Sequence, residues 1–402
     1  MRELIFSTTR NVALNPGRLD QALERFTAQH HVPVRLLEID TEFAMQELNS
    51  FAQHQTGADV SQMGTTWLRG FVDMNALRPL SLKNDVRFGH PDHDVTSFIP
   101  ILWQSTHTPD IAEPWAIPWL ADVRMVYYRR DLLARAGVDE QIAFQTPQAL
   151  EETLQRLQAN GVACPWAVPT RFSWRTLHNV ASWVWAANGD FVSPDGKRVL
   201  LTQPPAMAGL QSYFSLARFM SDQVRNFSTA LDFNDLFLSG DAAVILSSGY
   251  LSLVGQGTLQ PEQVGVAAPL GIPFIGGSHL VTWQHTKYDH DATQLVHFLT
   301  RFDTQQSYGL GNLLPVRLDA LSALGEAGGH AGEFVHKLLH WLPQGRMLPS
   351  VYLWNVIEAR VTKALAQVWE EVLATHEPDL EAILRRQLLP VTQFLDMMLR
   401  DR

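Results

Sequence analysis

Cysteine, lysine and long apolar runs are scarce in this 402-residue chain. Cys164 is the only cysteine, so a disulfide and a cysteine-based metal site are excluded, and a small buried hydrophobic role is expected for it. No stretch reaches the ~20 apolar residues that a membrane-spanning helix needs. Only five of the 31 basic residues are lysines and the net charge is −10, which disfavours a polybasic membrane contact and nucleic acid as the main partner.

Catalytic signatures are also missing. The motifs HEXXH, G-x-S-x-G and GxxxxGK[ST] do not occur, and GQGTLQ does not have the pattern of a dinucleotide fingerprint. Glu333, His336 and His340 follow helical spacing, but a histidine pair without a third ligand is more typical of a helix surface than of a zinc site. The sequence therefore predicts no catalytic residue, no metal and no cofactor.

What the chain does have is enough apolar sequence for two cores. Hydrophobic residues make up 46% and charged residues 18% of a length that exceeds one ordinary domain. Strand-like patterns at Ile5–Thr8, Val32–Ile39 and Val60 are each followed by apolar residues at helical spacing. This alternation predicts βαβ units and a mainly parallel sheet.

Residues 115–138, WAIPWLADVRMVYYRRDLLARAGV, carry the most specific local pattern. A Pro-punctuated segment precedes the β-rich VRMVYY and a helix that stops at Gly137, so the expected order is strand, turn, strand, helix. Further on, TPQALEE predicts a helix over 147–160, a second helix is expected over Tyr213–Met220, and GDAAVILSS reads as a strand. The Gly- and Ala-rich residues 323–332 are the expected flexible linker.

This stretch, together with others in order along nearly the whole chain, resembles the extracellular solute-binding proteins of the sugar ABC-transporter type, the maltose-binding-protein-like family. The other segments are Glu3–Thr9, LDQALERF, VPVRLLEI, FAMQELNSFAQHQTGADVSQMGTTWLRGFVDMNALRPL, GDAAVILSSGY and HDATQLVHFLTRFDTQQSYGLGNLLPVR. Each is a packing pattern when taken alone. Their shared order is what carries the resemblance.

The resemblance implies a two-lobed α/β fold of the periplasmic-binding-protein-like type II. Each lobe would hold a mainly parallel sheet flanked by helices, with a ligand cleft at a hinge of three chain crossings. Residues 1–120 and 280–318 are expected in lobe 1, and residues 121–279 and 319–402 in lobe 2. Such a protein binds and delivers a ligand and does no chemistry on it, so no enzyme activity is expected.

Ligands of open α/β sheets lie at the carboxyl ends of strands. The candidates after the first and third strands are Thr9, Arg10, Asn11, Gly64, Thr65, Thr66 and Trp67. The first three also suit a solvated turn. Relatives often have an acid near the position of Thr66, and its absence departs from the usual hydroxyl-binding pattern. Trp67 is equally suited to anchor the core at a helix start.

Two chain crossings supply further candidates. Asp122 follows WAIPWLA, where the resemblance carries a ligand-contacting acid, and a carboxylate accepts hydrogen bonds from sugar hydroxyls. A capping role is the alternative for Asp122. At the second crossing Gly277, Ser278 and His279 form a loop with Gly276, whose glycines would let backbone amides approach a ligand.

Aromatic side chains provide platforms for the apolar faces of sugar rings. Arg171, Trp174 and His178 recur at helical spacing with Asn179 and Trp183, although such stripes pack in cores more often than they bind ligands. Trp174 is favoured as the platform because it begins the segment beside polar neighbours.

Three further aromatic residues are candidates on the basis of the resemblance. Tyr250 falls where relatives place a stacking tryptophan. Tyr352 and Trp354 precede a helix expected over 355–374, and they suit either a platform or packing between helices.

The predicted function is binding of a mono- or oligosaccharide and, as a monomer, its delivery by hinge closure to the transmembrane subunits of an ABC permease, without nucleic acid. Five arginines would favour an anionic sugar or a phosphodiester if they approached the cleft: Arg10, Arg124, Arg171, Arg175 and Arg317. An enzyme that has recruited the same scaffold is a further alternative.

The start of the chain leaves two locations open. Strand-like ELIFSTT begins at residue 3, where an exported precursor would carry a signal peptide. Either this is the processed form of a periplasmic or extracellular protein that reaches the membrane through its transporter, or the protein works in the cytoplasm as a ligand sensor or regulatory partner.

Overall fold

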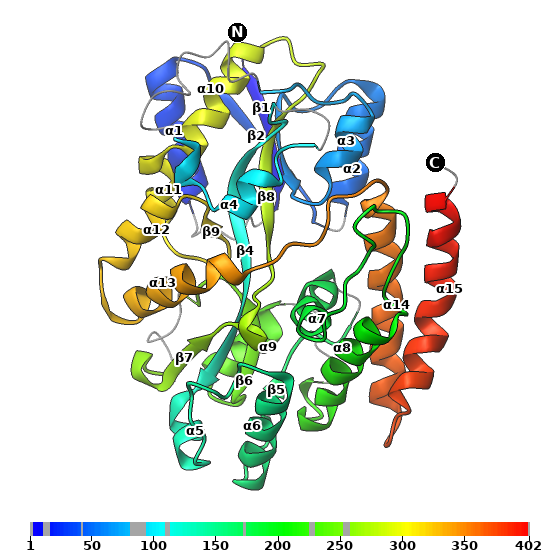
Figure 1. The fold of residues 1–402 in the computed structure, drawn as a ribbon. Helices are drawn as coiled ribbons and strands as arrows, with labels where there is room; N and C mark the ends of the chain where they lie inside the picture. Colours follow the sequence, from blue (N-terminus) through cyan, green and yellow to red (C-terminus); the bar gives the residue numbers. More distant parts are fainter. Residues whose placement is uncertain are drawn as a thin grey trace. The chain divides into compact units, whose positions relative to one another are not determined.

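The structure, a computed structural model, divides the chain into two compact units (Figure 1). The residues it describes are 3–10, 17–41, 43–80, 94–108, 113–171, 174–224, 230–251 and 258–400. Unit 1 comprises Met1–Val123, Ile275–His336 and Ser350–Tyr352, and unit 2 comprises Arg124–Phe274, Lys337–Pro349 and Leu353–Arg402.

The boundaries of the two units differ from the predicted boundaries of the two lobes. The lobes are predicted to change at 120, 279 and 318, whereas the units change at 123, 274 and 336, with a short return at 350–352. The third difference arises because α12 (Leu318–Gly325) packs against α11 and β9 of unit 1. How the units correspond to functional lobes stays a prediction.

Unit 1 is built on a mixed sheet in the order β2-β1-β3-β8-β4, with β9 added beside β4. The strands are β1 (Leu4–Thr9), β2 (Val34–Ile39), β3 (Val60–Gly64), β4 (Ile117–Arg129), β8 (Ile275–Thr282) and β9 (Leu314–Pro315). β1 is parallel to β2 and β3, but β8 is antiparallel to both β3 and β4. The α/β class is confirmed, but the sheet is mixed and not mainly parallel, because β4 leads out of unit 1 and β8 leads back into it.

Helices cover both faces of the unit 1 sheet (Figure 1). One face carries α1 (Arg18–His30), α10 (Asp289–Thr300) and α11 (Phe302–Tyr308), the other α2 (Ala44–His54) and α3 (Leu68–Asp73), and α4 (Pro100–Gln104) precedes β4. Apolar residues at helical spacing form the contact faces. Phe26 of α1 meets Phe298 of α10 edge-on at 5.4 Å, and Phe51 and Phe71 pack around Trp283 on the other face.

Unit 2 combines a small sheet with a layer of helices. The second half of β4 pairs antiparallel with β6 (Val244–Ser248) and β7 (Val264–Ala267), and β5 (Trp166–Ala167) is parallel to β6. The helices are α5 (Arg130–Arg135), α6 (Pro147–Ala159), α7 (Trp174–Ala186), α8 (Pro204–Phe214), α9 (Ala230–Leu238), α14 (Trp354–Ala374) and α15 (Leu380–Arg400). Among them α7, α8, α14 and α15 pack as one layer, in which Tyr213 contacts Trp369 at 5.7 Å.

The segment 115–138 contains one continuous strand and not the predicted strand, turn and strand. β4 runs through Pro118, and its register with β8 shifts between Pro118 and Leu120. A proline is tolerated in a strand at such an irregularity, so no turn is needed. The helix that follows ends before Gly137, whose φ of 66° gives the predicted glycine stop.

Other predicted elements are confirmed or corrected by local chemistry. The helix predicted over 147–160 is α6, which begins with Thr146 accepting the Ala149 amide at 3.1 Å. The helix predicted over Tyr213–Met220 is instead the end of α8 followed by a 3-10 helix at Ser215–Phe219.

The expected flexible linker at 323–332 is wrong. α12 ends at Gly325 and α13 (Gly329–Trp341) begins four residues later. Gly328 and Gly329 have φ of 70° and 61°, so these glycines make a tight turn between two helices.

Candidate ligand-binding site

A single glutamine, Gln62 of β3, connects the end of β1 to β8 in unit 1. The Gln62 carboxamide oxygen accepts hydrogen bonds from the Thr8 hydroxyl at 2.5 Å and from the Thr9 amide and hydroxyl at 3.0 and 3.1 Å. Its amide nitrogen donates to the Ser278 hydroxyl at 3.2 Å. Two predicted ligand residues, Thr9 and Ser278, thus belong to one polar row. Sequence reasoning misses Gln62 because a lone glutamine has no motif; its place two residues before Gly64 is the only signal.

Replacing Gln62 by alanine is expected to destabilise unit 1 by about 2 kcal/mol, because the donors of the buried Thr8 and the half-buried Thr9 lose their acceptor. The shift in the chemical denaturation midpoint, followed by tryptophan fluorescence, measures this loss. Gln53→Ala on the exposed side of α2 is the matched control, with an expected change within about 0.5 kcal/mol. Equal midpoints for the two variants would contradict the linking role of Gln62.

The turn after β3 brings together four predicted residues. The Thr65 amide donates to the Gly277 carbonyl at 3.1 Å, and the Trp67 amide donates to the Gly64 carbonyl at 3.0 Å. The Trp67 ring lies beside Gly64, where an added Cβ would come within 3.1 Å of it. Thr66 is half-buried, and Trp67 packs half-buried against the unit 1 core. Trp67 therefore has the packing role offered as its alternative, and its ligand contact stays a prediction.

The predicted loop at Gly276–His279 is a strand, part of β8. In the β4–β8 ladder Ala121 is opposite Gly277 and Asp122 is opposite Gly276. Gly277 has φ 135°, and a Cβ there would lie 2.1 Å from the Leu120 carbonyl oxygen. Only glycine permits this approach of the two strands. Asp122 is 4% exposed, so its carboxylate is held largely within the protein.

His279 lies inside unit 1, with 0% exposure. Its Nε2 is 3.0 Å from the Ser105 hydroxyl, and that hydroxyl donates to the Leu102 carbonyl at 2.8 Å. Nε2 must therefore carry the ring proton, and Nδ1 has no hydrogen-bond partner among the described residues. Burial lowers the pKa of His279 to about 3, although a contact with the Ser105 backbone acts in the opposite direction. This setting indicates packing, and the predicted ligand contact is not tested by it.

In unit 2, ring contacts bring predicted residues together on α7. His178 stacks on Phe274 with ring centroids 4.3 Å apart, and Trp174, one turn earlier, contacts His178 at 4.8 Å. The guanidinium groups of Arg124 and Arg175 lie 5.5 and 4.5 Å from the Trp174 ring centre, within cation–π range. The helical spacing of Trp174 and His178 is confirmed as one turn of α7.

Polar contacts surround the same imidazole. His178 Nδ1 is 3.5 Å from an Arg124 nitrogen, and Nε2 is 3.9 Å from the Glu358 carboxylate. Phe274 and Glu358 escape sequence reasoning because each is distant from α7 along the chain. Asn179 and Trp183, on the same helix, are buried at 1% and 0% exposure, so the structure assigns them to packing.

Tyr250 follows the turn at the end of β6. The Tyr127 hydroxyl fixes this turn by donating to the Gly249 carbonyl at 2.7 Å and accepting the Leu251 amide at 3.3 Å. Tyr250 is half-buried, and burial raises its pKa. Its hydroxyl therefore keeps its proton at neutral pH and is able both to donate and to accept.

Tyr352 and Trp354 belong to different units. Tyr352 is half-buried in unit 1, whereas Trp354 is the first residue of α14 in unit 2 and only 1% exposed. Leu353 between them has φ 59°, a strained value for a leucine. Packing is thus the role that the structure supports for Trp354.

Arg10 and Arg171 are exposed, and Asn11 lies outside the described residues.

Two other side chains singled out by the sequence are buried. Arg317 is 1% exposed, pairs with Asp319 at 2.6 Å and lies 5.6 Å from the Phe98 ring centre, so its charge is used within unit 1. Cys164 is 3% exposed and donates to the Trp166 carbonyl at 3.4 Å, which confirms the small buried role. In the part of the chain that is described, no three His, Cys, Asp or Glu side chains gather as a metal site would require.

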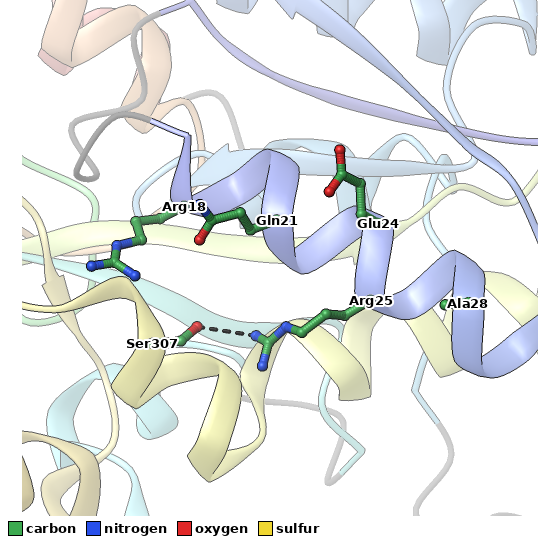
Figure 2. Close-up of a pocket in the computed structure, with 6 residues that line it drawn as sticks. All are labelled: Arg18, Gln21, Glu24, Arg25, Ala28 and Ser307. Carbon is green, nitrogen blue, oxygen red and sulfur yellow. Dashed lines mark hydrogen bonds between the residues drawn. The ribbon is translucent and has the colours of Figure 1, made fainter.

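Two surface hollows flank α1 in unit 1. The first has a volume of about 570 Å³ and is lined by Arg18, Gln21, Glu24, Arg25, Ala28 and Ser307 (Figure 2). The second has a volume of about 410 Å³ and is lined by Asp20, Leu23, Glu24, Thr27, Ala28, Val34 and Leu36. Neither lining contains a residue predicted to touch the ligand.

Two α/β units, joined where β4 leaves unit 1 and β8 returns to it, are the architecture of two-domain binding proteins. The family model of the bacterial extracellular solute-binding protein matches residues 21–329, and the chain belongs to this family. The family is one of binding proteins and not of enzymes, and it is named for its extracellular location. Within the described residues no helix has both the length and the apolar character needed to cross a bilayer.

Named relatives are distant. The chain is 25% identical over 234 residues to a probable ABC transporter-binding protein of Deinococcus radiodurans, a match covering 53% of the chain and 55% of that relative. The chain thus spans about half the length of this relative. It is 23% identical over 344 residues to a Brucella abortus protein named as a binding protein, covering 83% of the chain and 79% of the relative.

Solved structures show the same fold at low identity. Maltose-bound MalE3 of T. maritima is similar with a TM-score of 0.81 at 20% identity, covering 98% of the chain and 100% of that protein. A solute-binding protein of Thermotoga lettingae with bound α-D-tagatose has a TM-score of 0.79 at 16% identity, covering 99% and 100%. UgpB of Mycobacterium tuberculosis, in complex with glycerophosphocholine, has a TM-score of 0.75 at 18% identity, covering 99% of each chain.

Proposed function

We propose that this protein binds a carbohydrate or carbohydrate-like solute and delivers it to an ABC-type importer. Family membership and the sugars bound by MalE3 and the T. lettingae protein support the ligand class. The observation that carries the proposal is the division of chemistry between the units. Unit 1 holds a row of hydrogen-bonding groups across β1, β3 and β8, and unit 2 holds a half-buried indole with guanidinium groups over its ring.

The unit 1 residues suit sugar hydroxyls. The Thr9 hydroxyl donates to Gln62 and can still accept a hydrogen bond, whereas the Ser278 hydroxyl accepts from Gln62 and can still donate its own proton. Asp122 lies on β4 beside β8, in the same ladder as Ser278. We propose that Thr9, Ser278 and Asp122, with the turn Gly64–Trp67, contact the ligand from unit 1.

The unit 2 residues suit a sugar ring. Trp174 is partly exposed, and His178, stacked on Phe274, limits the movement of its indole. Arg124 is 1% exposed and is left to contacts within unit 2. Arg175 is partly exposed, and its guanidinium lies over the Trp174 ring, so its N–H groups would offer donors to sugar hydroxyls next to the indole. We propose Trp174 as the main platform, with Tyr250 and Arg171 as further contacts.

Delivery of the solute to the permease would depend on contacts that the solute makes only in the closed state of the protein. A ligand that touches both units only in a closed state shifts the population toward that state, and the closed form would dock on the permease subunits. We propose that the protein acts in this way outside the cytoplasm, as a monomer, and reaches the membrane through its transporter. Small-angle scattering tests the closure: a ligand that binds without any compaction would contradict it.

The ligand class is tested by calorimetric titration with maltose, tagatose and glycerophosphocholine, the solutes bound by the solved relatives. Native mass spectrometry of the purified protein adds any co-purified solute. Binding of a neutral sugar supports the proposal. A preference for glycerophosphocholine or a uronic acid would instead favour an anionic sugar or a phosphodiester as the natural ligand. No saturable binding across a wide sugar panel would refute carbohydrate as the ligand class.

Trp174→Ala is expected to weaken binding of the solute found in that panel by at least about tenfold, because the stacking surface is lost. Trp174→Phe, which keeps a smaller ring, should recover part of the affinity. Trp341→Ala, at a half-buried indole on α13, is the matched control and should bind as the wild type does. An unchanged dissociation constant for Trp174→Ala would exclude Trp174 as the platform.

A further inference from the structure

The turn that carries Tyr250 is tied to a phenol from another strand. Gly249 begins this turn directly after β6 and has φ 57°, one of the many conformations that a glycine adopts. A glycine at this place does not fix the path of the chain, so other contacts must select one. The Tyr127 hydroxyl does so on both sides of Tyr250, because it donates to the Gly249 carbonyl and accepts from the Leu251 amide.

Tyr127 is itself held in place by its surroundings. It lies on β4 between two other strands of unit 2, opposite Ile245 of β6 and opposite Val266 of β7. Its ring meets Phe237 of α9 edge-on, with the ring centroids 6.4 Å apart, and its side chain is 0% exposed. A packed ring on a strand that is paired on both sides is a rigid support for a neighbouring turn.

The buried phenol is suited to two hydrogen bonds at once. Burial raises the pKa of Tyr127 well above its usual value, although the bond from the Leu251 amide acts in the opposite direction. The hydroxyl therefore keeps its proton and both donates and accepts, which a phenolate does not do. Without this hydroxyl, the Gly249 carbonyl and the Leu251 amide lose these partners, so the turn is no longer held to one path.

We propose that Tyr127 is a positioning residue of the solute site, which holds Tyr250 in the orientation that contacts the solute. The inference rests on the proposed function, in which Tyr250 is one of the contacts from unit 2. A contact residue that is already held in place loses less conformational freedom when a ligand binds, so its interactions contribute more to affinity. Tyr127 acts through the turn and does not touch the solute.

Tyr127→Phe tests the proposal by removing the hydroxyl and keeping the ring. Calorimetric titration with maltose and with tagatose should show binding weakened at least about fivefold, or by about 1 kcal/mol. The same change in a Tyr250→Ala background should cost less than about twofold, because the residue that it positions is gone. Tyr128→Phe is the matched control and should keep the wild-type affinity, since this neighbour points to the opposite face of β4 and donates to Glu140 at 3.0 Å.

A readout without solute tests the positioning by itself. In protein labelled with fluorotyrosine, the fluorine NMR resonance of Tyr250 is assigned by its loss in Tyr250→Phe. It should be a single sharp line in the wild type and in Tyr128→Phe, and should broaden or split in Tyr127→Phe as the turn samples several conformations. In the unlabelled wild type, the Leu251 amide should exchange slowly with solvent because it is bonded to a buried phenol.

Either kind of measurement can overturn the proposal. It is wrong if the Tyr250 resonance stays a single sharp line in Tyr127→Phe, or if the Leu251 amide of the wild type exchanges freely. It is also wrong if Tyr127→Phe binds a sugar as tightly as the wild type, or if its loss is undiminished in the Tyr250→Ala background. Absence of binding by every sugar refutes the proposed function, and the fluorine resonance then still decides whether Tyr127 positions Tyr250.

Discussion

Gly277→Ala is expected to destabilise unit 1 by about 3 kcal/mol or more and to weaken solute binding. The Gly277 φ of 135° is one that an alanine rarely adopts, and the new Cβ would lie 2.1 Å from the Leu120 carbonyl oxygen and 2.9 Å from the Ala121 Cα. Because those contacts are backbone atoms of β4, no side-chain movement relieves them. The strands would have to separate next to Asp122 and Ser278.

Thermal and chemical denaturation of Gly277→Ala measure this loss. Gly17→Ala is the matched control, since Gly17 also has a positive φ, 74°, but an added Cβ would meet no atom within 4 Å. The control should lose only about 1 kcal/mol, the cost of the backbone conformation alone. A Gly277→Ala protein as stable as the control would show that β4 and β8 tolerate separation, and the close-approach argument would be wrong.

Acidification is expected to remove on the order of 4 kcal/mol of stability through His279 alone. The unfolded chain takes up a proton on this histidine as the pH falls below its usual pKa of 6.5, whereas burial keeps the folded ring neutral down to a pKa of about 3. The stability associated with the neutral ring is therefore complete above pH 6.5 and declines as the pH falls from 6.5 to about 3. Protonation inside unit 1 would create a buried Nδ1–H with no acceptor among the described residues.

His279→Gln tests this by removing the titrating group while keeping a donor near the Ser105 hydroxyl. Its unfolding free energy, measured between pH 7 and 4, should fall less steeply than that of the wild type, whatever its stability at pH 7. Gln53→Ala, on the exposed side of α2, removes no titrating group and is the control that should follow the wild-type slope. Parallel curves for wild type and His279→Gln would contradict a neutral, buried His279.

The helices that could be predicted are those whose signals come from residues close together along the chain. The spacing of Leu19, Leu23 and Phe26 gives α1, and Thr146 followed by Pro147 gives the start of α6. The turn predicted around Pro118 was wrong, because a proline usually marks a turn, yet here it occupies an irregularity within a long strand. The run 323–332 misled because glycines that suit a linker also suit a tight turn between helices.

The candidate site is only partly accessible to sequence reasoning. Trp174 and His178 lie together because both are on one helix, and this follows from their spacing. Gln62, Phe274 and Glu358 join predicted residues through contacts between distant segments, which no local pattern reports. Which predicted residues touch a solute remains the subject of the proposed binding experiments.

The helices α1 and α6, the scarcity of cysteine and the family resemblance were determined by the sequence alone, because they depend on composition and on neighbours within a few residues. The tertiary structure decided that the sheet is mixed, that His279 is enclosed and that Gly277 must be glycine. The physical reason is that strand direction, burial and close approach depend on which distant segments pack together. The paired residues of β4 and β8 are more than 150 positions apart along the chain, so only the fold brings them together.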